Sequence, residues 1–139
     1  MKKLKELLTN NLVLKDNLTS PQIKKLSEEG AIVLVPVGST EQHGPHLPVG
    51  TDALMATSMS EKLAAALGQK GVPCVVAPTI AVANSTHHMS FAGSLTLRPE
   101  TYLALLRDYC HSIASHGFRK ILLVNGHGGN IAPTNTALI

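Results

Sequence analysis

Three short apolar runs are the clearest pattern along this chain of 139 residues. They cover residues 31–37, 72–80 and 119–124, and each is nearly continuous in apolar side chains rather than alternating with polar ones. Continuous runs of this length are typical of strands that are covered on both faces. The pattern therefore predicts three strands of a buried, mainly parallel sheet.

The segments between these runs carry apolar residues at helical spacing. Capping hydroxyls, prolines in a first turn and glycines after a last turn mark their ends. The expected helices run from residues 19–21 to Gly30, over residues 53–67, from residues 98–100 to Gly117, and onward from residue 131 to residue 139.

Two of these helices show a distinct apolar stripe. The stripe of the second helix consists of Leu54, Met55, Met59, Leu63, Ala66 and Leu67, and that of the third consists of Leu103, Leu106, Cys110 and Ile113. Helix and strand thus alternate along the chain. This alternation predicts an α/β fold, a three-layer sandwich with a mainly parallel sheet, in a single domain over residues 1–139.

The composition supports this fold and excludes several functions. Apolar residues make up 44% and charged residues 15% of the chain, which is enough for a core and unlike a disordered segment. Aromatic residues make up only 3%, which argues against single-stranded nucleic acid as a partner, because such binding needs aromatic stacking platforms. The net charge of +3 is modest. We interpret the N-terminal lysines as a solvated basic face formed by Lys2, Lys3, Lys5, Lys15, Lys24 and Lys25.

The two cysteines and the N-terminal residues indicate the cellular compartment of the protein. Cys74 and Cys110 match no zinc or redox spacing, so we interpret them as reduced thiols. No apolar run approaches the length needed to span a membrane. The first 14 residues look like a signal peptide only superficially, because polar residues interrupt their apolar stretch. These features predict a cytoplasmic protein with no membrane partner.

The first apolar run leads into a loop with candidate chemistry. Residues 38–52 read GSTEQHGPHLPVGTD and place Glu41, His43, His46 and Asp52 within twelve positions. One histidine alone would favour an ordinary hydrogen-bonded side chain, but four such residues together favour metal ligands. A mixed set of imidazoles and carboxylates suits Zn, Mn or Fe, and a carboxylate can bridge two ions. Asp52 is the natural candidate for the bridge.

The third apolar run leads into a second such loop. Residues 125–130 read NGHGGN and present His127 from a glycine-rich turn. Polar residues 84–88 follow the second run in the same way. Because ligands bind beyond the carboxyl ends of parallel strands, these loops are expected to meet. One cleft is therefore expected to hold Glu41, His43, Asp52 and His127.

Other interpretations of these residues stay open at this point. Asp52 precedes an expected helix and could cap its N-terminus, and Glu41 could be a surface carboxylate. The turn at residues 125–130 could bind phosphate, although it lacks the Lys-Ser/Thr pair of a P-loop and its glycines do not fit G-x-G-x-x-G. A metal-dependent hydrolase remains the leading hypothesis.

Two motifs carry a resemblance to a known family. PVGSTEQHGPHLPVGTD at residues 36–52, together with VNGHGGN at residues 124–130, resembles the creatininase (creatinine amidohydrolase) family. The resemblance extends from about residue 18 to residue 139, and residues 85–97 are similar to a family segment that follows the second strand. It implies a cytoplasmic, metal-dependent, three-layer α/β enzyme that often forms hexamers.

The resemblance also implies site residues. Glu41, Asp52 and His127 would hold one divalent ion, and His43 and Asp52 would hold a second ion, with Asp52 as the bridge. His87 and His88 are expected to line the substrate pocket or a subunit contact. No catalytic proton-transfer residue is assigned.

The chain departs from the family pattern in two places. Creatininase itself has a Glu two residues after the His of the second motif, where this chain has Gly129. Family members with two glycines there usually take a Glu from a motif nearer the C-terminus, which would lie beyond residue 139. We therefore expect the N-terminal portion of a family member, incomplete at its C-terminus.

The resemblance implies hydrolysis of a non-peptide C–N bond in a small amide. The family acts on cyclic amides such as creatinine or on formamides, and some members cleave a small peptide. Gly129 makes creatinine a weaker expectation than a formamide or another small amide. The alternative is a catalytically inactive metal-binding or oligomerising fragment of such an enzyme.

Overall fold

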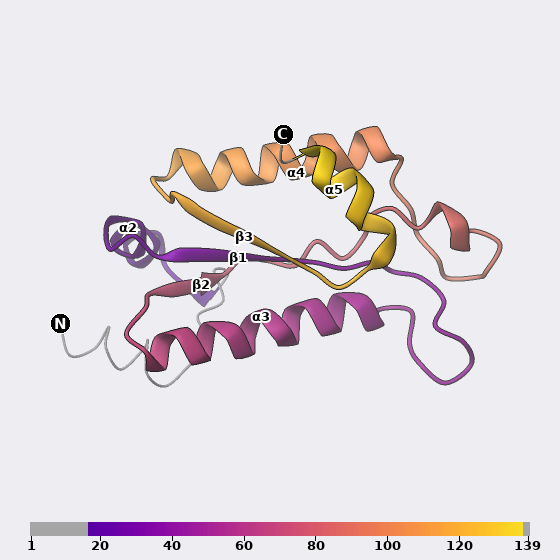
Figure 1. Ribbon diagram of the computed structural model, residues 1–139, viewed down its shortest axis with the longest axis horizontal. Coiled ribbons are helices and arrows are strands. Elements are labelled where there is room, and N and C mark those ends of the chain that lie inside the picture. The colour runs from indigo at the N-terminus through magenta and orange to yellow at the C-terminus, as the bar shows by residue number, and fades with distance from the viewer. Residues whose placement is uncertain (1–16, 138–139) are drawn as a thin grey trace.

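The computed structural model describes residues 17–137, and within this range the sheet has three parallel strands in the order β2-β1-β3. The strands are β1 (Ile32–Val37), β2 (Cys74–Val76) and β3 (Lys120–Asn125). Helices cover both faces of the sheet (Figure 1). The predicted α/β sandwich with a parallel sheet is therefore confirmed. The basic face that includes Lys2, Lys3, Lys5 and Lys15 lies outside the described residues, as do the last two residues of the expected fourth helix.

The helices follow the predicted order. They are α2 (Ser20–Glu28), α3 (Thr51–Gln69), α4 (Pro99–Ser115) and α5 (Ile131–Ala137), with short 3-10 helices η2 (Thr86–His88) and η3 (Gly128–Asn130). Pro21 lies in the first turn of α2, where its missing N–H costs nothing, and Pro99 does the same for α4. No helix within residues 17–137 combines the length and apolar character that crossing a membrane requires.

β1 is the central strand and is buried along almost its whole length. Its side chains alternate between two cores, because successive residues of a strand point to opposite faces. Val33, Val35 and Val37 join the larger core with Leu106 of α4, whereas Leu34 faces the smaller core with Ala64 of α3. Burial on both faces explains why this strand reads as a continuous apolar run.

α3 buries a different face from the one its apolar stripe suggested. The buried residues of the helix are Asp52, Ala56, Ser60 and Ala64, at intervals of four. Leu54, Met55 and Met59 are more than half exposed. The apolar stripe is therefore mostly exposed, and of its residues Leu67 packs against the smaller core. Small side chains let the helix axis lie close to the sheet, and Asp52 at the end of this face is carried inward.

β2 is shorter than the apolar run that predicted it. The run covered residues 72–80, but regular pairing ends at Val76, and only an isolated bridge between Val37 and Ile80 resumes it. Pro78 lies in the gap and has no N–H to donate to a ladder. The chain leaves the sheet at this proline and returns at Ile80, whose N–H donates to Pro36 O at 3.0 Å.

α4 and α5 lie together on the face of the sheet opposite α3 (Figure 1). The Tyr102 hydroxyl of α4 is buried and lies 2.9 Å from the Thr134 hydroxyl of α5. This contact fixes α5, and with it the loop that precedes α5, against the rest of the domain.

Candidate metal centre

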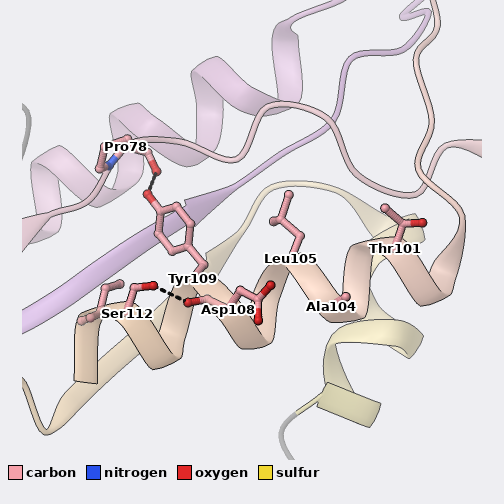
Figure 2. A pocket seen from close by; sticks show the side chains of 8 residues that line it. Pro78, Thr101, Ala104, Leu105, Asp108, Tyr109 and Ser112 are labelled. Atoms are coloured by element: carbon pink, nitrogen blue, oxygen red, sulfur yellow. Dashed lines mark hydrogen bonds between the residues drawn. The ribbon is translucent and has the colours of Figure 1, made fainter. Parts of the chain in front are cut away.

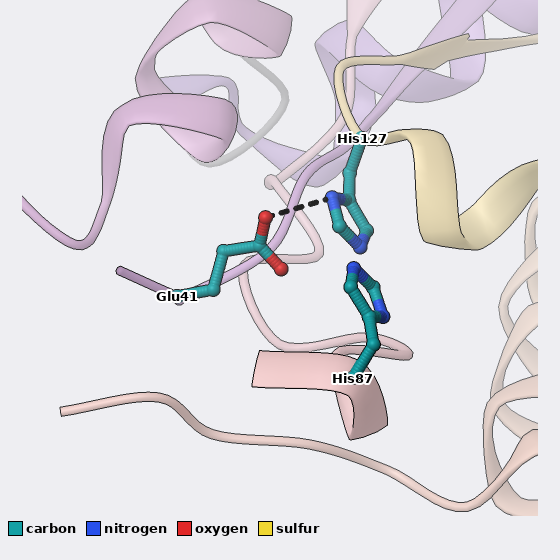
Figure 3. Close-up of side chains that lie close together, drawn as sticks. All are labelled: Glu41, His87 and His127. Carbon is teal, nitrogen blue, oxygen red and sulfur yellow. Dashed lines mark ion pairs between the residues drawn. The ribbon is translucent and has the colours of Figure 1, made fainter. Parts of the chain in front are cut away.

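Three loops meet at the carboxyl edge of the sheet. The first follows β1, the second follows β2 and contains η2, and the third follows β3 and contains η3. Each strand ends at this edge because all three run parallel. Figure 3 shows Glu41, His87 and His127, one residue from each loop, with their side chains directed toward one another.

Asp52 lies in the first turn of α3, and its side chain does not cap the helix. Its Oδ1 is 2.9 Å from His43 Nε2, and its Oδ2 is 2.9 Å from His127 Nδ1. The two oxygens of this buried carboxylate therefore face two different histidines. That arrangement removes helix capping as the role of Asp52 and is the one a bridging carboxylate needs.

Glu41 is the second buried carboxylate of the site. The first loop holds it through its backbone N–H, which donates to Val49 O at 2.9 Å. Its Oε1 lies 3.3 Å from His127 Nδ1 and 3.7 Å from His88 Nε2. At 5% exposure it is not the surface carboxylate that the sequence left open.

His43 has one nitrogen fixed by the backbone and the other directed at Asp52. Nδ1 lies 3.1 Å from Glu41 O, and because a carbonyl only accepts, Nδ1 is the donor. In the neutral ring, Nε2 then presents a lone pair to Asp52. The pKa of His43 is raised, chiefly by the bond to the Glu41 carbonyl and further by the Asp52 charge, against an opposing effect of burial.

His127 repeats this arrangement from the other side. Its Nε2 donates to Asn84 O at 2.9 Å, so the neutral ring presents the Nδ1 lone pair to Asp52 and Glu41. A histidine that binds metal usually donates its other N–H to a carbonyl or carboxylate, which fixes the tautomer. Both His43 and His127 meet that condition through backbone carbonyls.

Two buried carboxylate oxygens of this site have no hydrogen-bond partner within the described residues. They are Glu41 Oε2 and Asp52 Oδ2. Asp52 Oδ2 is close to His127 Nδ1, but that nitrogen carries no proton in the tautomer set by Asn84. Buried carboxylate oxygens without partners are costly. Cations would satisfy both oxygens, so the residues present fit a metal site.

The described residues form two overlapping groups with the geometry of a metal site. One consists of Glu41, His43 and Asp52, and the other of Glu41, His87 and His127; within each, the candidate ligand atoms lie within 4.8 Å of one another. All four predicted ligands are thus brought together, and their role as ligands stays a prediction. His46 is exposed and belongs to neither group.

His87 and His88 lie on η2 at the solvent side of the cluster. The His87 ring is parallel to the His127 ring, with centroids 5.6 Å apart and an interplanar angle of 3°. His88 Nδ1 lies 3.3 Å from Gln42 Nε2. Both residues are therefore adjacent to the carboxylates, as their predicted place at a substrate pocket requires.

The sequence did not single out the residues that hold the three loops together. Asn130 is fully buried, donates to Gly38 O at 2.9 Å and accepts from the Asn84 N–H at 3.2 Å. Its position inside the NGHGGN motif was the available signal. Its side chain joins the ends of the three loops and so fixes the positions of their ligands.

A groove lined by other residues lies away from the carboxyl edge. It has a volume of about 830 Å³ and runs along α4, where the Tyr109 hydroxyl donates to Pro78 O at 2.6 Å (Figure 2). Asp108 is the only charged residue in its lining. Without a cluster of reactive groups, this groove does not compete with the carboxyl edge as the reactive site.

The chain is similar to known proteins over most of its length. The family model for creatinine amidohydrolase matches residues 16–138. The mycofactocin precursor peptide peptidase of Mycobacterium tuberculosis is 38% identical over 125 residues, which is 86% of this chain and 48% of the relative. The 3-dehydro-scyllo-inosose hydrolase of Thermotoga maritima is 34% identical over 112 residues, which is 80% of this chain and 34% of the relative.

A solved structure of Mn creatininase superposes with a TM-score of 0.80 at 25% identity, over 91% of this chain and 51% of that chain. The chain thus spans about half the length, or less, of the relatives it matches. Its fold agrees with that of the solved structure over that span. The chain therefore belongs to the creatininase family.

Proposed function

We propose that this chain forms the metal-binding part of a metal-dependent hydrolase that cleaves the C–N bond of a small amide, such as a cyclic amide like creatinine or a formamide. The observation that carries the proposal is the pair of histidines, His43 and His127. Each has one nitrogen fixed by a backbone carbonyl and directs the other at Asp52. The name of the mycobacterial relative makes a peptide C–N bond a further candidate.

The ligand assignment follows the distances. Glu41, Asp52 and His127 are proposed to hold one divalent ion, and His43 and Asp52 to hold a second, each Zn, Mn or Fe. Two ligand atoms that are each about 2.1 Å from one ion lie roughly 3–3.5 Å apart, close to the separations found in this site. Ions in such a site lower the pKa of bound water to about 7 and polarise a carbonyl oxygen.

His88 is placed to donate a hydrogen bond to a substrate at this site. Its Nδ1 faces the amide Nε2 of Gln42, which can only donate, so the ring proton lies on Nε2. That N–H points toward Glu41 Oε1 at 3.7 Å, too far for a strong hydrogen bond. A substrate oxygen or nitrogen that approaches from the solvent side would accept a hydrogen bond from this N–H. His87 lies beside His88 on the same solvent side, and both are proposed to contact the substrate.

The exposed face of α3 favours the oligomerising role that belongs to the alternative, a catalytically inactive metal-binding or oligomerising fragment. Leu54, Met55 and Met59 are between 56% and 63% exposed. Adjacent exposed apolar side chains of this size usually mark an association surface. A homo-oligomer is therefore proposed, and the free thiols of Cys74 and Cys110 support the cytoplasm as its location.

Metal loading and hydrolysis separate these functions. The chain is stripped with a chelator and reloaded with Zn, Mn or Fe(II). Bound metal is measured by elemental analysis, hydrolysis of a panel of amides by ammonia or formate release, and mass by sedimentation. Two bound ions with amide hydrolysis support the enzyme. Two ions without hydrolysis, in an oligomer, support the alternative. An Asp52→Ala variant that binds metal like the wild type contradicts both.

A further inference from the structure

His87 is the one member of the two metal-site groups that the family motifs do not assign as a ligand. It comes from η2, in the loop after β2, whereas Glu41 and His127 come from the loops after β1 and β3. One candidate ligand atom of each of these three residues lies within 4.8 Å of the others. Figure 3 shows the His87 ring turned toward both the Glu41 carboxylate and the His127 ring.

Gly129 makes room for His87. A Cβ at position 129 would lie 2.9 Å from His87 Cε1 and 2.5 Å from Asn84 O. It would also lie 2.4 Å from His127 Nε2. Real Cβ atoms do not approach so closely, so any larger residue at 129 would displace the His127 ring, the loop at Asn84 or the His87 ring. The observed position of the His87 imidazole therefore requires a glycine at position 129.

The Glu41 carboxylate supplies the independent sign of a ligand. Its side chain is more than nine-tenths buried, and Oε2 has no hydrogen-bond partner within the described residues. Glutamate and histidine together are known ligands of catalytic zinc.

We propose that His87 is a further protein ligand of the ion held by Glu41, Asp52 and His127, and that Gly129 makes this fourth ligand possible. This inference rests on the proposed function, because it adds a ligand to the metal site proposed there. It makes His87 a metal ligand in addition to a neighbour of the substrate. His88 does not share this role, because its Nδ1 is engaged by Gln42 and it belongs to neither metal-site group.

Cobalt(II) serves as the probe, because its visible absorption reports coordination independently of activity. Wild type is expected to bind two ions. His87→Ala is expected to bind one of them at least tenfold more weakly in competition with a chromogenic chelator, with a changed visible spectrum. His88→Ala is the matched control on the same 3-10 helix and is expected to keep both affinities and the spectrum.

A cysteine at position 87 gives a direct signature. His87→Cys is expected to produce a thiolate-to-cobalt charge-transfer band, which arises only when the sulfur touches the ion. The proposal is overturned if His87→Ala holds both ions at wild-type affinity and His87→Cys shows no such band. If wild type binds no cobalt, both this proposal and the proposed metal-dependent function fail. If wild type binds cobalt and the His87 variants show no effect, only the role of His87 fails.

Discussion

Gly126 lies against the backbone of Asp52, so closely that a Cβ at position 126 would come within 2.6 Å of the Asp52 carbonyl oxygen. The Gly126 N–H also donates to Val37 O at 2.8 Å, which fixes the loop to the end of β1. Gly38 approaches the same turn of α3 from β1, since a Cβ there would lie 2.8 Å from the Asp52 carbonyl carbon. The absence of side chains at these two positions lets Asp52 reach His127.

A methyl group at position 126 is expected to separate the loop from the helix. Gly126→Ala should lower the free energy of unfolding by about 1–3 kcal/mol through overpacking and should weaken metal binding as Asp52 moves away from His127. Urea unfolding and metal titration measure the two effects. Gly128→Ala is the control, because a Cβ there meets nothing within 4 Å. Equal losses in both variants would contradict the close-approach argument.

Removal of the proposed bridge is expected to cost more metal than removal of a terminal ligand. Asp52→Ala should lose both ions, because each Asp52 oxygen faces a different histidine, whereas His43→Ala should lose only one. Elemental analysis of the purified variants gives the number of ions per chain. The same metal content in wild type and Asp52→Ala would refute the bridging role.

Metal binding is expected to stabilise the fold with a clear ion preference. Zn or Mn at 100 times its dissociation constant should add about 2.7 kcal/mol per site to the free energy of unfolding. Mg should add little, because it prefers an octahedral oxygen shell to imidazole nitrogen. Thermal unfolding with each ion, compared with the Glu41→Ala variant, tests this. A similar rise in melting temperature with Mg would argue against histidine ligation.

Asn130 is expected to be the main structural tie among the three loops. Asn130→Ala should lower the free energy of unfolding by about 2–4 kcal/mol, because it leaves Gly38 O and the Asn84 N–H without their buried partner. Urea unfolding measures the loss. Asn135→Ala, at an exposed position of α5, should change stability by less than about 0.5 kcal/mol. A similar small change for Asn130→Ala would show that the loops are held by other contacts.

The Cys74 thiol predicts a decline in stability at alkaline pH. Burial raises the pKa of Cys74 from 9.0 to about 11 in the folded protein. Between these values the unfolded chain binds fewer protons than the folded one, so stability falls as pH rises. From pH 8 to pH 10 the contribution is about 1 kcal/mol. Urea unfolding of Cys74→Ala should show a correspondingly smaller decline, and equal declines in both proteins would contradict this contribution.

The fold was predictable where one property of the sequence decides the structure. β1 must avoid water on both faces, so its position could be read from its apolar run alone. The four candidate ligands could be placed at one edge because parallel strands force their following loops together. The placement of η2 after β2 also brought His87 and His88 to that edge.

Other features depend on contacts that no local pattern records. The axis of α3 comes close to Gly38 and Gly126, and this distance sets the buried face of the helix. Small residues are therefore buried there, and Leu54 and Met59 are exposed. The tautomers of His43 and His127 depend on two carbonyls that are brought near only by tertiary structure. The end of β2 depends on Pro78, which interrupts an apolar run that otherwise looks continuous.

The hydrogen bond between Asn130 and Gly38 joins residues 92 positions apart, and this separation has a consequence for biogenesis. A loop of that length closes slowly, and topologies rich in distant contacts fold more slowly than local ones. The nascent chain has no complete site while β3 is still being synthesised, because His127 follows that strand. Under the proposed ligand set, the ion shared with His127 would be captured only after the third loop has been translated, whereas His43 and Asp52 both precede β3.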